Sequence, residues 1–296
     1  MEGPIPVTLG ICAYNEVANI ERAVRSVFEQ ALDGFVLKEA IVVSSGSTDG
    51  TDDAVKALMK EFASLRLIRQ EKREGKNSAI NCFLDSKGTD LVAILNADTV
   101  FSDDRCFQKL LEPFLDRDTG IVGGHPIPTN EKKTVAGFAS HMIWTMHHHV
   151  SLVQPKIGEI IAFRDIGTRL SVNSSGDEDT LKMRLEKNGL RSVYAPDAKV
   201  FNRGPETLKD FVKQRIRVNI GERCIKEEHD FEVPTWSMRM LYPALINTVK
   251  DLGFSPVKLS ISTGAEIYSR VKAYMHVRFG KGDIHIWEQI KTTKKL

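Results

Sequence analysis

The chain has 296 residues, of which 42% are hydrophobic and 27% are charged, which excludes an intrinsically disordered protein and allows one large hydrophobic core. Its formal net charge of +2 is too small to indicate a nucleic-acid-binding protein. The sequence contains neither a recognisable secretion signal nor a run of eighteen apolar residues, so we expect a cytoplasmic protein with, at most, peripheral contact with the cytoplasmic face of a membrane.

Strands and helices alternate through the first hundred residues. An apolar strand over 7–12 is followed by a helix for which Asn15 is the expected N-cap. Further strands are predicted at 40–43, 65–68 and 91–95, with helices around 55–62 and 76–84 between them. This order predicts an α/β fold with a mostly parallel sheet covered by helices, in which ligands bind at the carboxyl ends of the strands.

The pattern is less regular beyond residue 101. Helices are expected at 107–115, at 135–152 and from Pro205 to about Ile220, and strands at 120–124, 160–163 and 193–196. The polar stretch 227–234 ends in a proline and predicts a boundary between an α/β domain, residues 1–226, and a helical C-terminal region, residues 227–296.

The C-terminal region is basic. From Arg239 to the end, ten lysines and arginines stand against four acidic residues, a balance of +6 that leaves −4 for the rest of the chain. Two predicted helices, 241–252 and 261–277, carry apolar residues at helical spacing among these charges. They could lie on an anionic membrane surface, or they could pack on the catalytic domain and expose an ordinary solvated face.

Polar segments follow three of the predicted strands, at 13–16, 44–49 and 96–99. In a parallel sheet they meet at one edge and could form a single nucleotide-sized site. Within Asn96-Ala97-Asp98, the carboxylate of Asp98 is placed to hold Mg²⁺ or Mn²⁺, because both ions prefer oxygen ligands. A strand-ending turn would explain the same tripeptide.

Two loops could contact the nucleotide. The glycine- and serine-rich stretch 44–51 can bring its backbone close to a base or ribose, although Asp49 and Thr51 could equally cap the next helix. Lys76 follows a glycine at a helix start, where it could reach a phosphate beside the positive end of the helix. An exposed loop lysine is the alternative.

Three acidic residues, Asp177, Glu178 and Asp179, open another predicted helix. Their charges could simply favour the helix N-terminus. Alternatively, one carboxylate could act as a general base that accepts the proton of an attacking hydroxyl, and the clustered negative charge would raise at least one of the three pKa values.

The sequence Gln214-Arg215-Ile216-Arg217 lies on a predicted helix. Gln214 and Arg217 share a face that could offer an amide and a guanidinium to a diphosphate or an acceptor, unless the helix is merely amphipathic. His141 and the run 147–149 suggest a metal site, but consecutive helical residues point in different directions, so this helix is a better candidate for the acceptor side of a cleft.

Taken in order, these motifs resemble family 2 glycosyltransferases. They are Ala-Tyr-Asn-Glu after the first strand, Gly-Ser-Thr-Asp-Gly-Thr after the second, Glu-Gly-Lys-Asn-x-Ala before a helix, Asn-Ala-Asp, an acidic helix start and Gln-Arg-x-Arg. The stretch Val193-Tyr-Ala-Pro-Asp-Ala, followed by Pro205-Glu-Thr-Leu, is similar to the membrane-associated and processive branch. The resemblance covers about residues 5–222.

The resemblance implies a GT-A fold and a metal-assisted reaction that inverts the anomeric carbon. The donor would be a nucleoside diphosphate sugar, first of all a UDP sugar, and the acceptor a hydroxyl of a glycan or a polyprenyl-linked intermediate. Carried over residue by residue, it places Ala13, Tyr14, Glu16, Ser44, Ser45, Lys76, Asn96 and Asp98 at the donor, and Gln214, Arg215 and Arg217 at the diphosphate or acceptor.

The chain departs from the family pattern at four places. Ser44 and Ser45 stand where aspartates are frequent, Asn96 replaces a frequent aspartate, and Val218 stands where the related motif has tryptophan. The register of the base is also ambiguous: counting back from Gly189 favours Glu178, whereas matching letters favours Asp179.

Two other classes of protein remain open. A nucleotidyltransferase on a similar sheet would release pyrophosphate, but no glycine-rich, arginine-bearing loop follows the first strand. A non-catalytic nucleotide-sugar-binding scaffold would be consistent with the serines at 44 and 45 and with Asn96. An NAD-dependent enzyme is disfavoured because no G-x-G-x-x-G follows the first strand.

Overall fold

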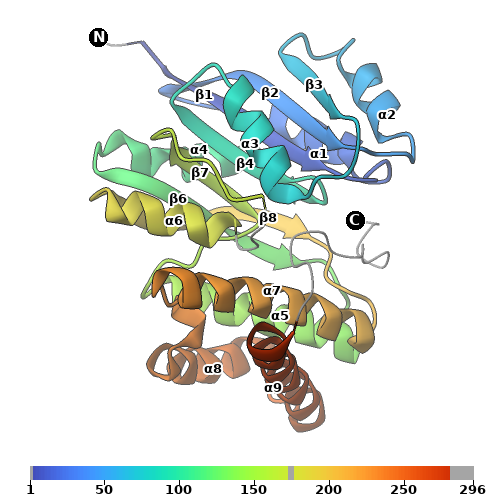
Figure 1. Ribbon diagram of the computed structural model, residues 1–296, viewed down its shortest axis with the longest axis vertical. Helices are drawn as coiled ribbons and strands as arrows, with labels where there is room; N and C mark the ends of the chain where they lie inside the picture. The colour runs from blue at the N-terminus through green and yellow to red at the C-terminus, as the bar shows by residue number, and fades with distance from the viewer. Residues whose placement is uncertain (1–2, 173–176, 281–296) are drawn as a thin grey trace.

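The computed structural model describes residues 3–172 and 177–280, and its strands form one eight-stranded sheet in the order β3-β2-β1-β4-β7-β6-β8-β5 (Figure 1). Strands β3, β2, β1 and β4 are parallel, β7 is antiparallel to β4 and β6, and β8 is parallel to β6 and antiparallel to β5. The strands are β1 (Ile5–Ala13), β2 (Phe35–Ser45), β3 (Leu65–Gln70), β4 (Leu91–Asn96), β5 (Thr99–Phe101), β6 (Thr119–Pro128), β7 (Ile160–Arg164) and β8 (Arg191–Asn202). The predicted α/β class and mostly parallel sheet are confirmed.

Helices cover both faces of the sheet. On one face lie α1 (Ile20–Phe28), α2 (Thr51–Leu58), α4 (Cys106–Leu111) and the 3₁₀ helix η1 (Glu112–Leu115). On the other lie α3 (Lys76–Ser86) and α6 (Asp177–Lys187). Each face has its own apolar core, because successive strand residues point to opposite sides of the sheet.

The alternation is clear in β1. Val7, Leu9 and Ile11 belong to the core under α1 and α2, whereas Gly10 faces α3. A Cβ at position 10 would lie 2.7 Å from the ring of Phe83, so only glycine lets this buried ring lie flat against the strand.

A second group of helices lies beyond the lower edge of the sheet in Figure 1. It comprises α5 (Val135–Ser151), α7 (Leu208–His229), the 3₁₀ helix η2 (Pro234–Trp236), α8 (Met238–Leu252) and α9 (Pro256–Phe279). Helix α9 packs on α7 and α5, and α8 packs on α5. The expected boundary at 227–234 overlaps the end of α7, and a separate C-terminal unit stays a prediction.

The first helix begins later than expected. Asn15 does not cap it: its backbone is left-handed, with φ of 52°, and its Oδ1 accepts a hydrogen bond of 2.8 Å from the backbone N–H of Thr48. Because that side chain is bound to the loop after β2, the chain turns once more before α1 begins at Ile20 with Asn19 at the N-cap. The two strand-end loops are thus joined to each other.

Three further expectations are corrected at element ends. Helix α7 begins at Leu208 rather than at Pro205, because the Thr207 side chain caps it by accepting from the Asp210 N–H. It continues to His229, well beyond the expected end near residue 220. Thr51 does not cap α2, since its hydroxyl oxygen accepts from the N–H of Glu16.

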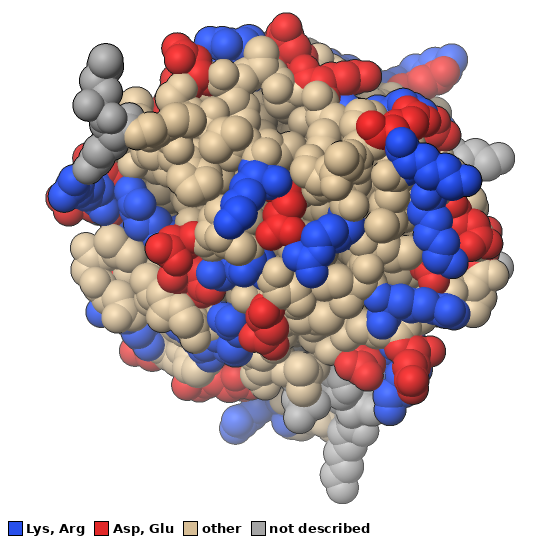
Figure 2. All heavy atoms as spheres, turned by 90° about the horizontal axis from the view of Figure 1, so that it is seen from above, with Lys and Arg blue, Asp and Glu red and all other residues tan. Residues whose placement is uncertain are grey.

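Within the described residues, every helix is too short or too polar to cross a lipid bilayer. The face in Figure 2, which views the molecule from the end where β1, β2 and β3 lie, carries basic and acidic side chains mixed together rather than a patch of one sign. This mixture agrees with the small net charge of the whole chain.

Candidate functional site

A cleft of about 750 Å³ lies where the carboxyl ends of the parallel strands meet the second group of helices. The sheet register explains its floor: Ala13 pairs with Ser44, and Cys12 pairs with Asn96, so three strand ends stop at one level. The cleft is lined by most of the predicted site residues, namely Ala13, Tyr14, Glu16, Ser45, Lys76, Asn96, Asp98, Glu178, Asp179, Gln214, Arg215 and Arg217.

Two predicted site residues are not placed in the cleft. Ser44 is fully buried beneath the β2 loop, where its hydroxyl hydrogen-bonds to Ser47 and Asp52. Its expected contact with a base is therefore not supported by its position. The side chain of Asp177 lies outside the described residues.

One end of the cleft is polar and basic. The guanidinium of Arg73 lies over the ring of Tyr14, 4.2 Å from its centroid, which makes a flat surface beside Ser45. Arg73 was not among the predicted site residues, although it belongs to the same loop as Lys76. Gly75 permits the turn into α3 with φ of 92°, and so places Lys76 at the first position of that helix.

Lys76 connects the donor side of the cleft to the acidic helix. Its Nζ lies 2.7 Å from Oε1 of Glu178, a residue 102 positions further along the chain. Both side chains line the cleft and are partly exposed to solvent. The candidate base and a candidate phosphate ligand therefore face the same space.

Asp98 and Glu159 place two carboxylates at the end of β4. Oε2 of Glu159 accepts a hydrogen bond of 2.7 Å from Nδ2 of Asn96, and the Asn96 backbone N–H donates to the Glu159 carbonyl oxygen. Burial raises the pKa of Asp98, against the effect of the positive charges of Lys76 and Arg217. Burial and the negative charge of Asp98 raise the pKa of Glu159 to about 7.

Sequence reasoning missed Glu159 altogether. It has a left-handed backbone with φ of 58°, a conformation that costs a side-chain-bearing residue of the order of 1 kcal/mol. The only signal in the sequence was a charged residue between Gly158 and the apolar strand β7.

Asp98 and Glu159 provide part of a coordination site for a divalent cation. Among the residues that the structure describes, no group of three or more His, Cys, Asp and Glu side chains is arranged around a common metal position. Two carboxylates whose charges repel each other suit Mg²⁺ or Mn²⁺, ions that commonly take one or two carboxylates and complete their coordination with substrate phosphates and water. Asp98 and Glu159 are the residues that would hold it.

The histidines of α5 do not converge. His148 stacks on His125 with ring centroids 4.2 Å apart, and Nε2 of His149 lies 2.7 Å from Asp251. His147 is buried at the wall of the cleft. The rings of His148 and His149 lie 5.2 Å apart, but the other partners of the three consecutive histidines differ.

Asp179 differs from its neighbour Glu178. It is almost fully buried and forms an ion pair with Lys156, which also lies 3.2 Å from Glu222 on α7. Burial raises the pKa of Asp179 in spite of the lysine. Both carboxylates line the cleft and pair with a lysine, but the Asp179 side chain is buried whereas that of Glu178 is partly exposed to solvent.

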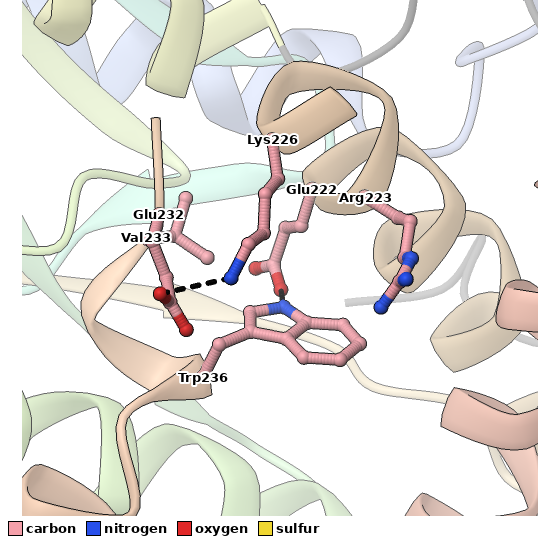
Figure 3. A pocket seen from close by; sticks show the side chains of 6 residues that line it. All are labelled: Glu222, Arg223, Lys226, Glu232, Val233 and Trp236. Atoms are coloured by element: carbon pink, nitrogen blue, oxygen red, sulfur yellow. Dashed lines mark hydrogen bonds and ion pairs between the residues drawn. The ribbon is translucent and has the colours of Figure 1, made fainter. Parts of the chain in front are cut away.

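The ion pairs around Lys156 extend through Glu222, which also lines the cleft, to Trp236. Figure 3 shows the Trp236 indole directed at Glu222, whose Oε2 accepts a hydrogen bond of 2.7 Å from Nε1. Burial alone would raise the pKa of Glu222, but the positive charges of Lys156 and Arg215 lower it below its usual value. The recess drawn there encloses no space for a ligand.

The side chains of the Gln-Arg-x-Arg motif make two kinds of contact. Gln214 and Arg217 line the cleft. Arg215 also reaches its wall, but its guanidinium makes two hydrogen bonds to Glu266 of α9, of 2.7 and 3.1 Å. Arg215 thus forms a bidentate ion pair within the protein, and its contact with a diphosphate or acceptor stays a prediction.

The end of the cleft that the helices form is mostly apolar, with Thr263, Glu266 and Arg270 of α9 among its polar side chains. Its apolar side chains come from α5, α7, α8 and α9, so the predicted acceptor-side helix contributes to it together with the C-terminal helices. They are Met142, Ile143, Trp144, Met146, Val218, Met238, Leu241, Tyr242, Leu245 and Ile267. A polar, charged end and an apolar end thus share one cavity.

Replacing Lys156 by methionine should destabilise the fold strongly. Asp179 and Glu222 would each lose a buried counter-ion, and we expect the free energy of unfolding to fall by about 3–5 kcal/mol in urea denaturation. Lys226→Met is the matched control, because its ion pair with Glu232 is exposed and should contribute at most about 1 kcal/mol. Equal losses in the two variants would contradict the assignment.

Glu159→Gln should alter how stability depends on pH. Glu159 binds its proton more tightly in the fold, with a pKa of about 7, than in the unfolded chain, so the wild type loses stability as pH rises from about 4.5 to 7. Measured in chelator, the variant should gain up to about 3 kcal/mol relative to wild type over that interval. A constant difference would show that Glu159 titrates normally.

Comparisons with known proteins agree with this geometry. The sequence pattern that defines "Glycosyl transferase family 2" matches residues 8–177. The chain is 24% identical over 222 residues to the poly-beta-1,6-N-acetyl-D-glucosamine synthase of Staphylococcus aureus (strain COL); the match covers 71% of this chain and 53% of that protein. The chain thus spans about half the length of the curated relatives it matches.

Solved structures show the same fold. The mannosyltransferase PcManGT from Pyrobaculum calidifontis, in complex with GDP-Man and Mn²⁺, superimposes with a TM-score of 0.65 at 19% identity, covering 93% of this chain and 88% of that one. TarS 1–349 of S. aureus, in complex with UDP-GlcNAc, gives a TM-score of 0.53 at 13% identity, covering 94% and 93%. These likenesses confirm the GT-A type of α/β fold, and the family pattern, which spans more than half of the residues, shows that this chain belongs to glycosyl transferase family 2.

Proposed function

We propose that this protein is an inverting glycosyltransferase that transfers a sugar from a nucleoside diphosphate sugar, a UDP sugar in the first instance, to a hydroxyl of a glycan or lipid-linked acceptor. The observation that carries the proposal is the shared cleft: a basic, carboxylate-bearing end at the strand termini and a cleft-facing carboxylate, Glu178, lie beside an apolar end. Family membership supports the same reaction class.

The donor would bind along the strand ends. Tyr14, Arg73 and Ser45 would form the surface for the base and ribose, and the positive charges of Lys76 and Arg217 would face the diphosphate. A divalent cation on Asp98 and Glu159 would offset the negative charge that develops on the leaving diphosphate. The nucleobase of the donor would be recognised without a carboxylate from position 44 or 45, since both residues are serine.

Glu178 is the residue that we assign as general base. It would accept the proton of the acceptor hydroxyl while that oxygen bonds to the anomeric carbon and the nucleoside diphosphate leaves from the opposite face, which inverts the anomeric configuration. Asp179 is buried against Lys156 and would instead fix the start of α6. The greater solvent exposure of Glu178 supports it over Asp179 as the proposed base.

The acceptor would lie in the apolar end of the cleft. Trp144 offers a flat surface of the kind that packs on a sugar ring or an isoprenoid, and the aliphatic side chains of α8 continue from it. Phe254 in the turn between α8 and α9 and Val257 at the start of α9 are 74% and 68% accessible, and they lie between Lys250 and Lys258. Such a combination suits contact with an anionic membrane that supplies a lipid-linked acceptor.

Glu178→Gln should lower kcat for sugar transfer by about 10²–10⁴-fold, because a general base contributes that much, with little change in donor affinity. Transfer and Kd should be measured with a panel of UDP and GDP sugars in Mn²⁺. Asp179→Asn is the comparison variant and should mainly lower the melting temperature. Retained transfer in Glu178→Gln would refute its role, and selective donor binding without turnover in wild type would favour a scaffold.

The membrane contact can be tested with liposomes. Wild type should sediment with vesicles that contain phosphatidylglycerol, and Phe254→Glu with Val257→Glu should lower the partition coefficient at least about tenfold, because burial of apolar area is lost and repulsion is added. Leu115→Glu, at an exposed apolar position on η1, is the control and should sediment like wild type. Wild type that stays in the supernatant would contradict the contact.

A further inference from the structure

The segment 156–159 contributes the carboxylate of Glu159 to the cleft, although no sequence motif marks this segment. It follows α5, precedes β7 and is held by Lys156, whose charge is buried against Asp179 and Glu222. Three residues later, Glu159 lines the cleft at the end of β4, next to Asn96 and Asp98 in space but about sixty positions away in sequence.

The backbone of Glu159 is held in an unfavourable conformation. Its φ of 58° is in the left-handed region, which glycine adopts without strain, and Gly158 immediately precedes it. Its backbone is fixed by the hydrogen bond from the Asn96 N–H to its carbonyl oxygen, 3.2 Å long. A strained residue with a long charged side chain, directed into a cleft by such contacts, is a reason to look for a role in that cleft.

Asn96 orients this carboxylate. Its Nδ2 donates a hydrogen bond of 2.7 Å to Oε2 of Glu159, and the Thr99 hydroxyl approaches the same oxygen at 3.5 Å. Asn96 is therefore a donor to the carboxylate, a contact that an ionised aspartate at position 96 could not make. The amide at 96 and the glutamate at 159 are complementary.

We propose that Glu159 is the second carboxylate ligand of the divalent cation, together with Asp98, and that it supplies from the start of β7 the charge that Asn96 does not provide at the end of β4. The inference rests on the proposed function only in that the cation would be shared with a nucleoside diphosphate. It requires two carboxylates at the cation, and it predicts that a carboxylate introduced at position 96 can replace the one at position 159.

The test is an exchange of charge between the two positions. Mn²⁺ binding to the full chain would be followed by the electron paramagnetic resonance signal of free Mn²⁺, with and without UDP as the diphosphate probe. Glu159→Gln should raise the Kd for Mn²⁺ in the presence of UDP at least about tenfold, because a charged ligand is lost. The double variant Asn96→Asp with Glu159→Gln should return to within about threefold of wild type.

Controls separate ligation from folding. Glu112→Gln, on η1 and outside the cleft, should bind Mn²⁺ like wild type, and circular dichroism melting without metal should show that every variant is folded. If Glu159→Gln fails to fold, Glu159→Asn replaces it, because asparagine tolerates the left-handed backbone. Unchanged Mn²⁺ affinity in a folded position-159 variant would overturn the proposal, as would a loss that Asn96→Asp does not repair.

The same measurements distinguish this inference from the proposed function. If wild type transfers sugar and its Mn²⁺ affinity is independent of Glu159, the inference alone fails. If Mn²⁺ binding depends on Glu159 while wild type shows no transfer with any nucleotide sugar, the cation site stands and the proposed reaction fails.

Discussion

A single buried lysine determines how the parts of the cleft are placed. Lys156 is the shared counter-ion of Asp179 on α6 and Glu222 on α7, and it belongs to the segment that leads into β7. A buried charge without a partner costs several kcal/mol. Separating α6, α7 and the segment before β7 would therefore carry a large free-energy penalty. Glu178 and Glu159, two of the three carboxylates assigned to the chemistry, each lie within a few residues of a member of this cluster. Their position follows from its geometry.

The part of the site that could be predicted from sequence is the part built from local order. Strand, polar segment and helix alternate along the first hundred residues, and parallel pairing brings the polar segments to one edge. Ala13, Asn96 and Asp98 therefore lie where the pattern placed them. The acidic start of α6 and the motif on α7 also line this cleft. Their place there was predicted from the resemblance to a known family and not from local order. Their roles in the reaction remain proposals.

The rest depended on contacts between distant residues. Asn15 suited a helix cap in type, yet its side chain is bound by Thr48, thirty-three positions away. Arg215 belonged to a motif with an expected ligand contact, but its partner is Glu266, which no local pattern predicts. Glu159 had no recognisable motif, because its importance lies in a left-handed backbone and in its proximity to Asn96. Such pairings appear only once the chain is folded.

The bidentate ion pair of Arg215 and Glu266 limits how far the C-terminal helices can be separated from the rest of the protein. It joins the helix that carries the Gln-Arg-x-Arg motif to α9, and Arg270 also binds Glu266 and thereby extends the link to the carbonyl oxygen of Thr235. An excised fragment that stops near residue 226 would carry Arg215 without its counter-ion, next to the residues assigned to the donor. Exchanging C-terminal segments between homologues would therefore require the acidic residue to travel with the graft, so the last helices cannot be treated as an interchangeable anchor.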